Sequence, residues 1–493
     1  MADDFGVDGL FEVDPAQRVD GDVAVSEAPV NKTFRVFDPD QGLLLPPSLD
    51  DWLPAEHLAR FIAELVDEHL DLSRIHCAYT EQRGGPPYDP RLMMRILLYG
   101  YTIGVRSSRA IETKCIDDVP FRWLAAGAAP DYRAIARFRK RHLSALGQLF
   151  VQALALCQAA GMVRLGRVAL DGTKVRANAS KRKAMSYARM SEKEKVLAEE
   201  VSALLAEAER IDKAEDAKFG KHRRGDELPE ELRRRESRLA KIRQAKAALE
   251  EEARQRAREH AEATARQRGE NEDTVAAKGE AAAQEAIPKP KAQRNFTDPD
   301  SKIMLTGDGA FHQCYNAQAV VDADHQVIVA TDVNTNAADV GNLIPMTDQT
   351  AANTGRVPDE LLVDAGYCSA TNLDHAAGYA AEHGTDFYIA TGRQRRDDPP
   401  PVAPRGPIPK DATEKQRMAR KMATKKGRKI YARRKAIVEP VFGQMHTLQN
   451  AKQLLLRGLH QARGEWQLLA ACHNIRKLHG HIGVNGLAGL ATS

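Results

Sequence analysis

The stretch from Lys181 to about Gln293 contains almost no aromatic residue and is dominated by Ala, Glu, Lys and Arg. This composition cannot bury a compact core and is typical of long helices. Within it, one aliphatic stripe has the 7, 3, 7 spacing of coiled-coil a and d positions, and a second stripe can face it. We therefore predict a long helical insertion, a coiled-coil hairpin that turns near Gly220 to Pro229. The two stripes are Leu232, Leu239, Ile242 and Leu249, and Val201, Leu204, Ala208 and Ile211.

Two short apolar runs that end in an aspartate flank this insertion. Residues 167–170 lead into Asp171, residues 361–363 lead into Asp364, and a glycine follows each aspartate within two residues. Each run predicts a strand that leads into a turn. Residues 316–331 alternate like two strands with a turn between them and predict a β-hairpin. Helical stretches lie between the later strands, so this part of the chain is predicted to be an α/β domain.

The N-terminal part of the chain predicts helices. From about Phe34 to Ala160, apolar residues such as Phe61 and Ile62 recur at helical spacing. The first thirty residues carry eight acidic side chains and one basic, which predicts a disordered acidic tail. One basic cluster fits DNA binding, although a solvated helix face is the commoner meaning of such a cluster. The cluster is Arg137, Arg139, Lys140 and Arg141.

The net charge of +4 hides an uneven distribution. Between Lys410 and Lys435 there are twelve Lys and Arg residues, against Asp411 and Glu414. A polyanionic partner is the natural inference from this run. The six cysteines form no C-x-x-C pair, and neither a signal peptide nor a membrane-spanning stretch is recognisable. We expect reduced thiols, no membrane partner and a cytoplasmic, nucleoid-associated protein.

Three acidic residues are candidates for a catalytic site. Asp171 and Asp364 follow strands, at the strand ends where ligands bind in α/β sheets. Glu439 lies on a later helix, off the apolar stripe that includes Ile437 and Val441, and can point back toward the strand ends. Mg²⁺ and Mn²⁺ prefer oxygen ligands, and two such ions can clamp the attacking and leaving oxygens of a phosphoryl displacement. The pattern predicts metal-dependent phosphoryl transfer.

Each acid alone has a simpler meaning. An Asp before Gly is more often a turn former, and a Glu among Lys and Arg is usually a surface residue. The combination of two strand-end aspartates, a helical glutamate and a dense basic run favours a site that acts on nucleic acid. Several other aspartates near the predicted strands stay open as ligands. These are Asp308, Asp322, Asp324, Asp332 and Asp339.

Four segments of this region resemble the DDE transposases of bacterial insertion sequences. They are VALDGTKVRANAS, YNAQAVVDADHQVIVATDVNTNAADVGNLIPM, LLVDAGYCSATNL and YARRKAIVEPVFGQMHTLQ. The N-terminal segments DPRLMMRILLYGYTIGVRSSRAIE and PDYRAIARFRKRH are similar to the helical N-terminal domain of the same family. Together the segments span most of residues 34–480.

The resemblance implies a ribonuclease H-like catalytic domain. In it, a central mixed sheet presents Asp171 and Asp364, and a helix presents Glu439. These three acids would bind Mg²⁺ or Mn²⁺, as two ions. The implied activity is cleavage at transposon ends followed by strand transfer into target DNA.

Residues around the glutamate carry a further part of the resemblance. The family has a Tyr, an Arg and a Lys there, and Tyr431 and Arg434 match the first two. His446 stands at the lysine position, where a neutral imidazole is a weaker phosphate partner than an ammonium. The predicted DNA contacts in this part of the chain are Tyr431, Arg433, Arg434, Lys435 and His446.

The predicted partner is double-stranded DNA, both transposon ends and target. We expect a homo-oligomer on DNA, because joining two ends requires more than one active site. The insertion can serve this assembly or pack only on itself, and both readings stay open. Two other functions also stay open: a metal-dependent nuclease of the same fold that cleaves without joining, and a non-catalytic DNA-binding scaffold derived from a transposase.

The predicted domain organisation follows from these observations. It comprises the acidic tail (1–33), an all-α N-terminal DNA-binding domain (34–160), a catalytic domain split in sequence (161–180 and 301–478), the helical insertion (181–300) and a C-terminal tail (479–493).

Overall fold

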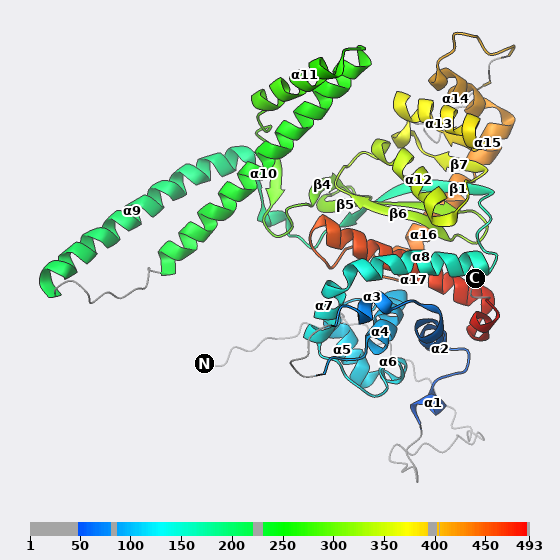
Figure 1. Ribbon diagram of the computed structural model, residues 1–493, viewed down its shortest axis with the longest axis horizontal. Helices are drawn as coiled ribbons and strands as arrows, with labels where there is room; N and C mark the ends of the chain where they lie inside the picture. The colour runs from blue at the N-terminus through cyan, green and yellow to red at the C-terminus, as the bar shows by residue number, and fades with distance from the viewer. Residues whose placement is uncertain (1–47, 80–85, 220–229, 393–401, 404, 491–493) are drawn as a thin grey trace, which may run out of the picture. The chain divides into compact units, whose positions relative to one another are not determined.

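A computed structural model describes residues 48–79, 86–219, 230–392, 402–403 and 405–490 (Figure 1). The predicted acidic tail and the predicted hairpin turn at 220–229 lie outside the described residues. None of the described helices combines the length and the apolarity that a membrane crossing requires.

A six-stranded mixed sheet forms the centre of the α/β part. Its order is β4-β5-β1-β7-β8, and β6 also pairs with β5. β1 is antiparallel to β5 and parallel to β7, and β7 is parallel to β8. This confirms the predicted α/β class with a central mixed sheet and is consistent with a ribonuclease H-like fold. The strands are β1 (Arg167–Arg176), β4 (Lys302–Leu305), β5 (Phe311–Asp322), β6 (Ile328–Asn334), β7 (Glu360–Val363) and β8 (Asp386–Ile389).

The register of β1 against β7 sets the two candidate aspartates at the same level. Arg167 pairs with Glu360, which lies 193 residues later in the chain. The same offset relates Asp171 to Asp364. Neighbouring strands lie about 4.8 Å apart, so two residues at one level of adjacent parallel strands are close neighbours.

Asp171 lies within β1 and not at its end, so the predicted turn at this aspartate is wrong. β1 continues as far as Arg176, which pairs with Cys314 of β5. The long antiparallel partner β5 holds this polar second half of β1 in the sheet, although its sequence does not look like a strand. The parallel pairing with β7 ends earlier, at Ala169. At Asp171, β1 is therefore paired with β5, while its described ladder with β7 has already ended.

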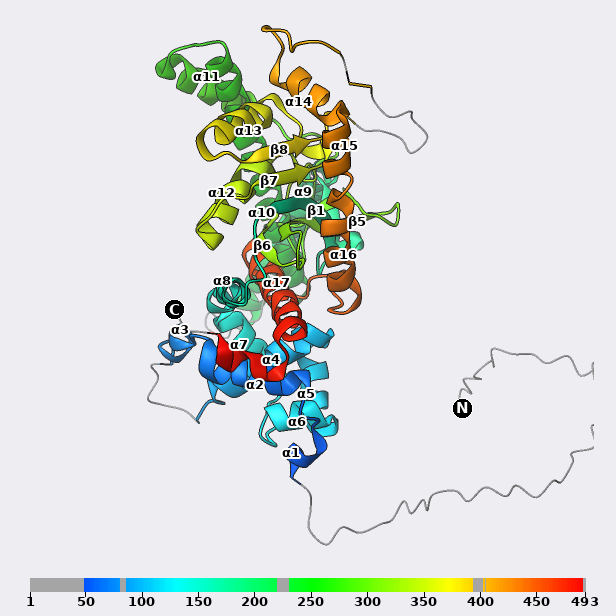
Figure 2. The same ribbon diagram turned by 90° about the vertical axis from the view of Figure 1, so that its right-hand side faces the viewer.

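Helices cover both faces of the sheet. Figure 2 shows α12 and α13 on one side of the strands and α15 and α16 on the other. Apolar residues of these helices, such as Leu343 of α12 and Val438 of α16, are buried. The helices are α12 (Leu343–Thr354), α13 (Ala370–His383), α14 (Glu414–Ala423), α15 (Lys425–Tyr431), α16 (Arg434–Thr447) and α17 (Leu459–Ile482).

The described part of the N-terminal region is built from helices. Phe61 and Ile62 are fully buried, as their helical spacing predicts. Helices α4 and α8 pack against α17, so this region and the sheet share one continuous apolar core. The α-helices are α1 (Leu49–Trp52), α2 (Leu58–Glu64), α3 (Ser73–His76), α4 (Pro90–Ile103), α5 (Ser108–Asp117), α6 (Val119–Leu124), α7 (Tyr132–Arg141) and α8 (Leu143–Ala159).

A buried ion pair joins the connection between α4 and α5 to α17, next to the segment that follows α16. Arg106 Nη1 donates to Glu465 Oε1 at 3.1 Å, and both side chains are almost fully buried. Glu465 Oε2 also accepts from two consecutive backbone N–H groups of that segment, at 2.8 and 2.9 Å. The neighbouring Leu454 N–H donates to the carbonyl oxygen of Arg176, the last residue of β1, at 2.8 Å. The ion pair therefore supports the far end of β1.

The insertion between β1 and β4 consists mainly of helices, as its composition predicts. The short strands β2 and β3 pair with each other at its two ends. Helix α10 packs on α9 and on α11. The elements are β2 (Ala184–Ser186), α9 (Tyr187–Phe219), α10 (Glu230–Gln267), α11 (Glu272–Glu285) and β3 (Gln293–Asn295).

A small apolar cluster holds α9 and α10 together. Residues of the predicted stripe on α10 are buried there against Met190 and Leu197 of α9, and Val201 of the second stripe packs on the cluster. The buried stripe residues are Leu239, Ile242 and Leu249. The side chains of Leu232, Ala208 and Ile211 lie outside the described residues. The coiled-coil character of the hairpin therefore stays a prediction.

Candidate active site

The carboxylate of Asp171 is the first part of the candidate site. Its Oδ2 accepts a hydrogen bond from Arg434 Nη1 at 2.8 Å, and its Oδ1 accepts from the backbone N–H of Gly172 at 2.9 Å. Burial raises the pKa of Asp171, the guanidinium of Arg434 opposes this rise, and the charge of Asp364 adds to it. Keeping this carboxylate ionised therefore costs free energy, which a nearby cation offsets.

Asp364 is the second part of the site. It follows the last residue of β7 and caps the short 3₁₀ turn η4 (Ala365–Tyr367), where its Oδ1 accepts from the backbone N–H of Gly366 at 2.7 Å. Its charge raises the pKa of Asp171 and that of Arg434. The two aspartates therefore share one electrostatic environment, as their common register level implies.

The Lys- and Arg-rich segment 410–435 places two residues beside the aspartates. Tyr431 ends α15, and Arg434 begins α16 and is buried. Burial raises the pKa of Tyr431, a hydrogen bond and the charge of Arg434 oppose the rise, and the charges of Asp364 and Asp171 add to it. The structure thus brings this tyrosine and arginine, both singled out in the sequence, to the pair of aspartates.

Glu439, the third predicted acid, differs from the two aspartates in its exposure to solvent. It is exposed on α16, five residues after Arg434. Among the residues that the structure describes, no group of three or more His, Cys, Asp or Glu side chains is placed to hold a metal ion. The structure brings Asp171 and Asp364 together, and the approach of Glu439 to them stays a prediction.

The chemistry of the two aspartates fits a hard divalent cation. Carboxylate oxygens are the ligands that Mg²⁺ and Mn²⁺ prefer. The guanidinium of Arg434 already sets a positive charge against Asp171 Oδ2. A bound cation would offset the remaining negative charge of these two carboxylates.

Two known protein families match separate parts of the chain. Residues 47–141 match the Transposase domain (DUF772), and residues 408–479 match the Transposase DDE domain. Two parts of the chain thus match transposase domains. The DDE match begins before α14 and includes Tyr431, Arg434 and Glu439. No curated protein and no solved structure matches the chain.

The two domain matches indicate the broad function. A DDE transposase domain implies transposition activity, and proteins of this kind are enzymes that bind DNA and generally depend on divalent metal. The part of the match that lies on α15 and α16 is the part that contacts Asp171.

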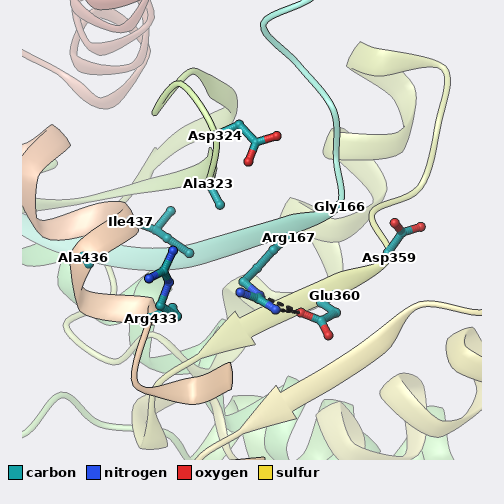
Figure 3. Close-up of a pocket in the computed structure, with 9 residues that line it drawn as sticks. All are labelled: Gly166, Arg167, Ala323, Asp324, Asp359, Glu360, Arg433, Ala436 and Ile437. Atoms are coloured by element: carbon teal, nitrogen blue, oxygen red, sulfur yellow. Dashed lines mark hydrogen bonds and ion pairs between the residues drawn. The ribbon is translucent and has the colours of Figure 1, made fainter. Parts of the chain in front are cut away.

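Basic side chains of the DDE match reach the surface beside this site. Arg433 and Lys435 are exposed. Arg433 also lines a cavity of about 530 Å³ at the start of β1 (Figure 3). In that cavity Arg167 forms an ion pair with Glu360 at 2.6 Å. Because Asp171 lies four residues further along β1, the cavity is a neighbouring feature and not the aspartate pair itself.

The N-terminal transposase domain contains the other predicted DNA contacts. Arg137, Lys140 and Arg141 are exposed on α7. Arg139 is only 7% exposed, and its guanidinium donates to Tyr101 Oη at 2.9 Å and to a backbone carbonyl at 3.0 Å. Arg139 therefore belongs to an internal network, in contrast to its three neighbours. The spacing of the cluster does not reveal this, because the partner tyrosine lies on α4.

His446 is half-buried on α16. Its Nε2 is buried and has no hydrogen-bond partner among the described residues. Burial lowers the pKa of His446, and the charge of Lys452 lowers it further. The imidazole is therefore neutral near pH 7, in line with the expectation that it is a weaker phosphate partner than a lysine.

Other residues at the site were not singled out by their sequence pattern. Tyr367 is buried, and its pKa is raised well above the ordinary value by burial and by the charges of Asp339, Asp171 and Asp364. Of the aspartates that the sequence left open, Asp339 therefore faces the same tyrosine as the pair. No spacing rule marks it, because its neighbours come from β1, β5 and the turn after β7.

Proposed function

We propose that this chain is a metal-dependent transposase that cleaves DNA at the ends of its element and joins the freed 3′ ends to target DNA. Asp171, Asp364 and Glu439 hold two Mg²⁺ or Mn²⁺ ions in this proposal. Bound divalent ions supply activation of the attacking oxygen and stabilisation of the leaving oxygen.

The observation that carries the proposal is the pairing of two aspartates from adjacent parallel strands next to an arginine of the DDE match. Asp171 and Asp364 provide carboxylates at one level of the sheet. Arg434 offsets part of their charge. In the proposed reaction the two aspartates orient the ions, and α16 brings Glu439 to them from the helix side.

The residues around the site suit a phosphate backbone. Arg433 and Lys435 are exposed next to Arg434, and we propose that they bind the DNA strand beside the cleaved bond, with Tyr431 at the same edge. Each such contact releases counterions, so binding weakens steeply as salt rises.

We assign recognition of the transposon ends to the N-terminal domain. Its exposed basic residues on α7 are positioned on a helix, the element that commonly enters a DNA groove. The proposed contacts are Arg137, Lys140 and Arg141.

We also propose that the protein works as a homo-oligomer on DNA, because two ends must be joined. The helical insertion is a candidate for the contact between copies.

A cleavage and joining assay on DNA that carries the element's own ends tests the proposal. Asp171→Ala, Asp364→Ala and Glu439→Ala should each abolish both steps while DNA binding persists. Asp359→Ala is the matched control, because this aspartate lines the neighbouring cavity and should leave both steps intact. Full activity of any of the three variants would remove that residue from the proposed site.

The same assay separates the alternative functions. Pre-cut ends bypass the first step, so a nuclease of the same fold would cleave intact DNA and yet leave pre-cut ends unjoined. A DNA-binding scaffold would show neither step and no dependence on Mg²⁺ or Mn²⁺.

A further inference from the structure

A partly buried polar network lies beside the pair of aspartates. Its centre is Asp339, in the connection between β6 and α12, whose Oδ1 accepts from Lys174 Nζ at 3.1 Å, from Asn316 Nδ2 at 2.7 Å and from Gln318 Nε2 at 2.9 Å. These donors come from β1 and β5. A carboxylate oxygen that receives three donors is held firmly in one orientation.

Gln318 extends this network to the turn that carries Asp364. Its Oε1 accepts a hydrogen bond from Tyr367 Oη, and Tyr367 is the last residue of the turn that Asp364 caps. Gln318 and Tyr367 are both fully buried. Because buried polar groups are costly to leave unpaired, the amide and the hydroxyl stay locked together.

The network also reaches β1 directly beside Asp171. Gln318 is the cross-strand partner of Gly172. A β-carbon at Gly172 would come within 2.7 Å of Asp339 Oδ1 and would also collide with Gln318 Nε2. A β-carbon at Gly366 would lie 3.6 Å from Asp339 Oδ2. Gly172 thus leaves room for Asp339 and Gln318, whereas the tight contact at Gly366 would be with Asp364 Oδ1 at 2.9 Å, and Asp339 lies at ordinary contact distance there.

The two aspartates differ in how the sheet holds them. Asp171 is paired with Ala319 within the ladder of β1 and β5. Asp364 lies beyond the last residue of β7, and the described ladder pairs of β7 end at Val363. The position of Asp364 relative to Asp171 therefore depends on what anchors its turn.

We propose that Asp339, Gln318 and Tyr367 are positioning residues that fix Asp364 at metal-binding distance from Asp171. The inference rests on the proposed function of the aspartate pair. The hydrogen bonds run from Lys174 to Asp339, from Asp339 to Gln318 and from Gln318 to Tyr367. They thus connect β1, which carries Asp171, to the turn that carries Asp364. Lys174 balances the charge of Asp339, so the network adds no uncompensated negative charge to the pair.

Tyr367→Phe is the most direct test, because it removes one hydroxyl and keeps the ring. The readout is Mn²⁺ binding to the full chain without DNA, measured by titration calorimetry or by the electron paramagnetic resonance signal of free Mn²⁺. We expect the dissociation constant to rise about fivefold, the size that one lost buried hydrogen bond can produce. The Mn²⁺ concentration for half-maximal cleavage should rise by a similar factor, while the DNA affinity stays unchanged.

Tyr388→Phe is the matched control. The Tyr388 ring is also buried, and its hydroxyl donates to Asp386 Oδ2 at 2.8 Å on β8, in a partly buried hydrogen bond outside the network. Both variants lose one tyrosine hydrogen bond and keep the ring. Only Tyr367→Phe should weaken Mn²⁺ binding. Equal Mn²⁺ affinity in both variants and the wild type would overturn the inference, as would equal weakening in both.

Asp339→Asn provides an independent second variant. An asparagine retains one acceptor oxygen and removes the charge that pairs with Lys174, so Mn²⁺ binding should weaken by about tenfold or more. Unchanged binding by this variant would overturn the inference and leave the proposed function standing. If instead the wild type binds Mn²⁺ no better than Asp171→Asn and Asp364→Asn, the proposed function fails and the positioning role fails with it.

Discussion

Arg434 and Asp171 form a direct ion pair of 2.8 Å across 263 positions of the chain. The two side chains are only 9% and 20% exposed. The pair ties the beginning of α16 to the centre of β1, and it sets a fixed positive charge against a carboxylate that burial disfavours in its ionised form. The site therefore carries part of the neutralising charge that the proposed metal ions would supply.

Arg434→Gln should destabilise the protein and make its stability depend on divalent metal. Loss of one partner of a largely buried pair costs roughly 2–3 kcal/mol, somewhat less than for a fully buried pair. A bound cation can restore the missing charge, so Mn²⁺ should recover more stability in this variant than in the wild type. Chemical denaturation with and without Mn²⁺ measures both effects. Arg463→Gln, which breaks an exposed pair with Asp332 at 3.0 Å, should show neither, and an equal Mn²⁺ effect in both variants would contradict the prediction.

Asp171→Asn should change how the stability of the protein depends on pH. Burial raises the pKa of Asp171, opposed by Arg434, so the folded state favours the protonated form. The stability from this group is fully present below the ordinary aspartate pKa and is lost as pH rises through the folded-state pKa. The asparagine does not titrate, but it leaves Arg434 without its ion pair. The free energy of unfolding of the variant, relative to that of the wild type, should therefore increase as pH rises from about 4 to 7, and chemical denaturation at several pH values measures this slope.

Asp308→Asn should show the opposite sign and serves as the comparison. Hydrogen bonds, the largest from the hydroxyl of Thr306, lower the pKa of Asp308. Its contribution is present above the ordinary pKa and is lost as pH falls through the folded-state value. The variant should be less stable than the wild type at pH 7 and approach it in acid. The same sign for Asp171→Asn and Asp308→Asn would refute the pKa assignments.

Arg433→Ala should weaken DNA binding and reduce its salt dependence. If the exposed guanidinium contacts one phosphate, the slope of log affinity against log salt should fall by about 0.9. Fluorescence anisotropy over a range of salt concentrations measures the slope. Arg139→Gln is the contrast, because the structure buries this arginine. It should lower thermal stability and leave the slope unchanged, and a reduced slope for Arg139→Gln would mean that this residue reaches DNA after all.

Glu465→Gln should loosen the far end of β1. The charge of Glu465 balances Arg106, and removal of one buried partner costs about 3 kcal/mol. Amide hydrogen exchange should become faster at Leu454, which bonds the carbonyl oxygen of Arg176. Glu360→Gln, which breaks the more exposed pair with Arg167, should not change exchange at Leu454. Equal protection at Leu454 in both variants would argue against this link.

The sequence predicted the strands that lead into the two aspartates but not how far the first of these strands extends. Apolar runs ending in Asp171 and Asp364 predicted two strands, and the α/β class with a central mixed sheet is confirmed; that the two strands are neighbours is seen only in the structure. The extension of β1 beyond Asp171 was not predictable from local sequence, because Lys174 is polar and its strand conformation depends on pairing with Asn316 of β5.

Local sequence patterns also could not predict the role of a side chain whose partners are distant in the chain. Arg139 looks like its exposed neighbours, and only Tyr101 on α4 reveals that it faces inward. Asp339 was one aspartate among several, and its place beside the pair follows from Lys174 and Gln318. Each of these partners lies at least 21 residues away in the chain.

The pairing of β2 with β3 brings the beginning and the end of the helical insertion side by side, with Ala184 opposite Asn295. The β1–β5 ladder is already closed at this point, because Ala177 N–H bonds the carbonyl oxygen of Gln313 at 2.8 Å before the chain enters the insertion. The base of the insertion is also fixed to the sheet by the ion pair of Glu252 on α10 with Lys302 on β4. A change in the length of α9 and α10 beyond Glu252 would therefore leave these attachments to the sheet in place.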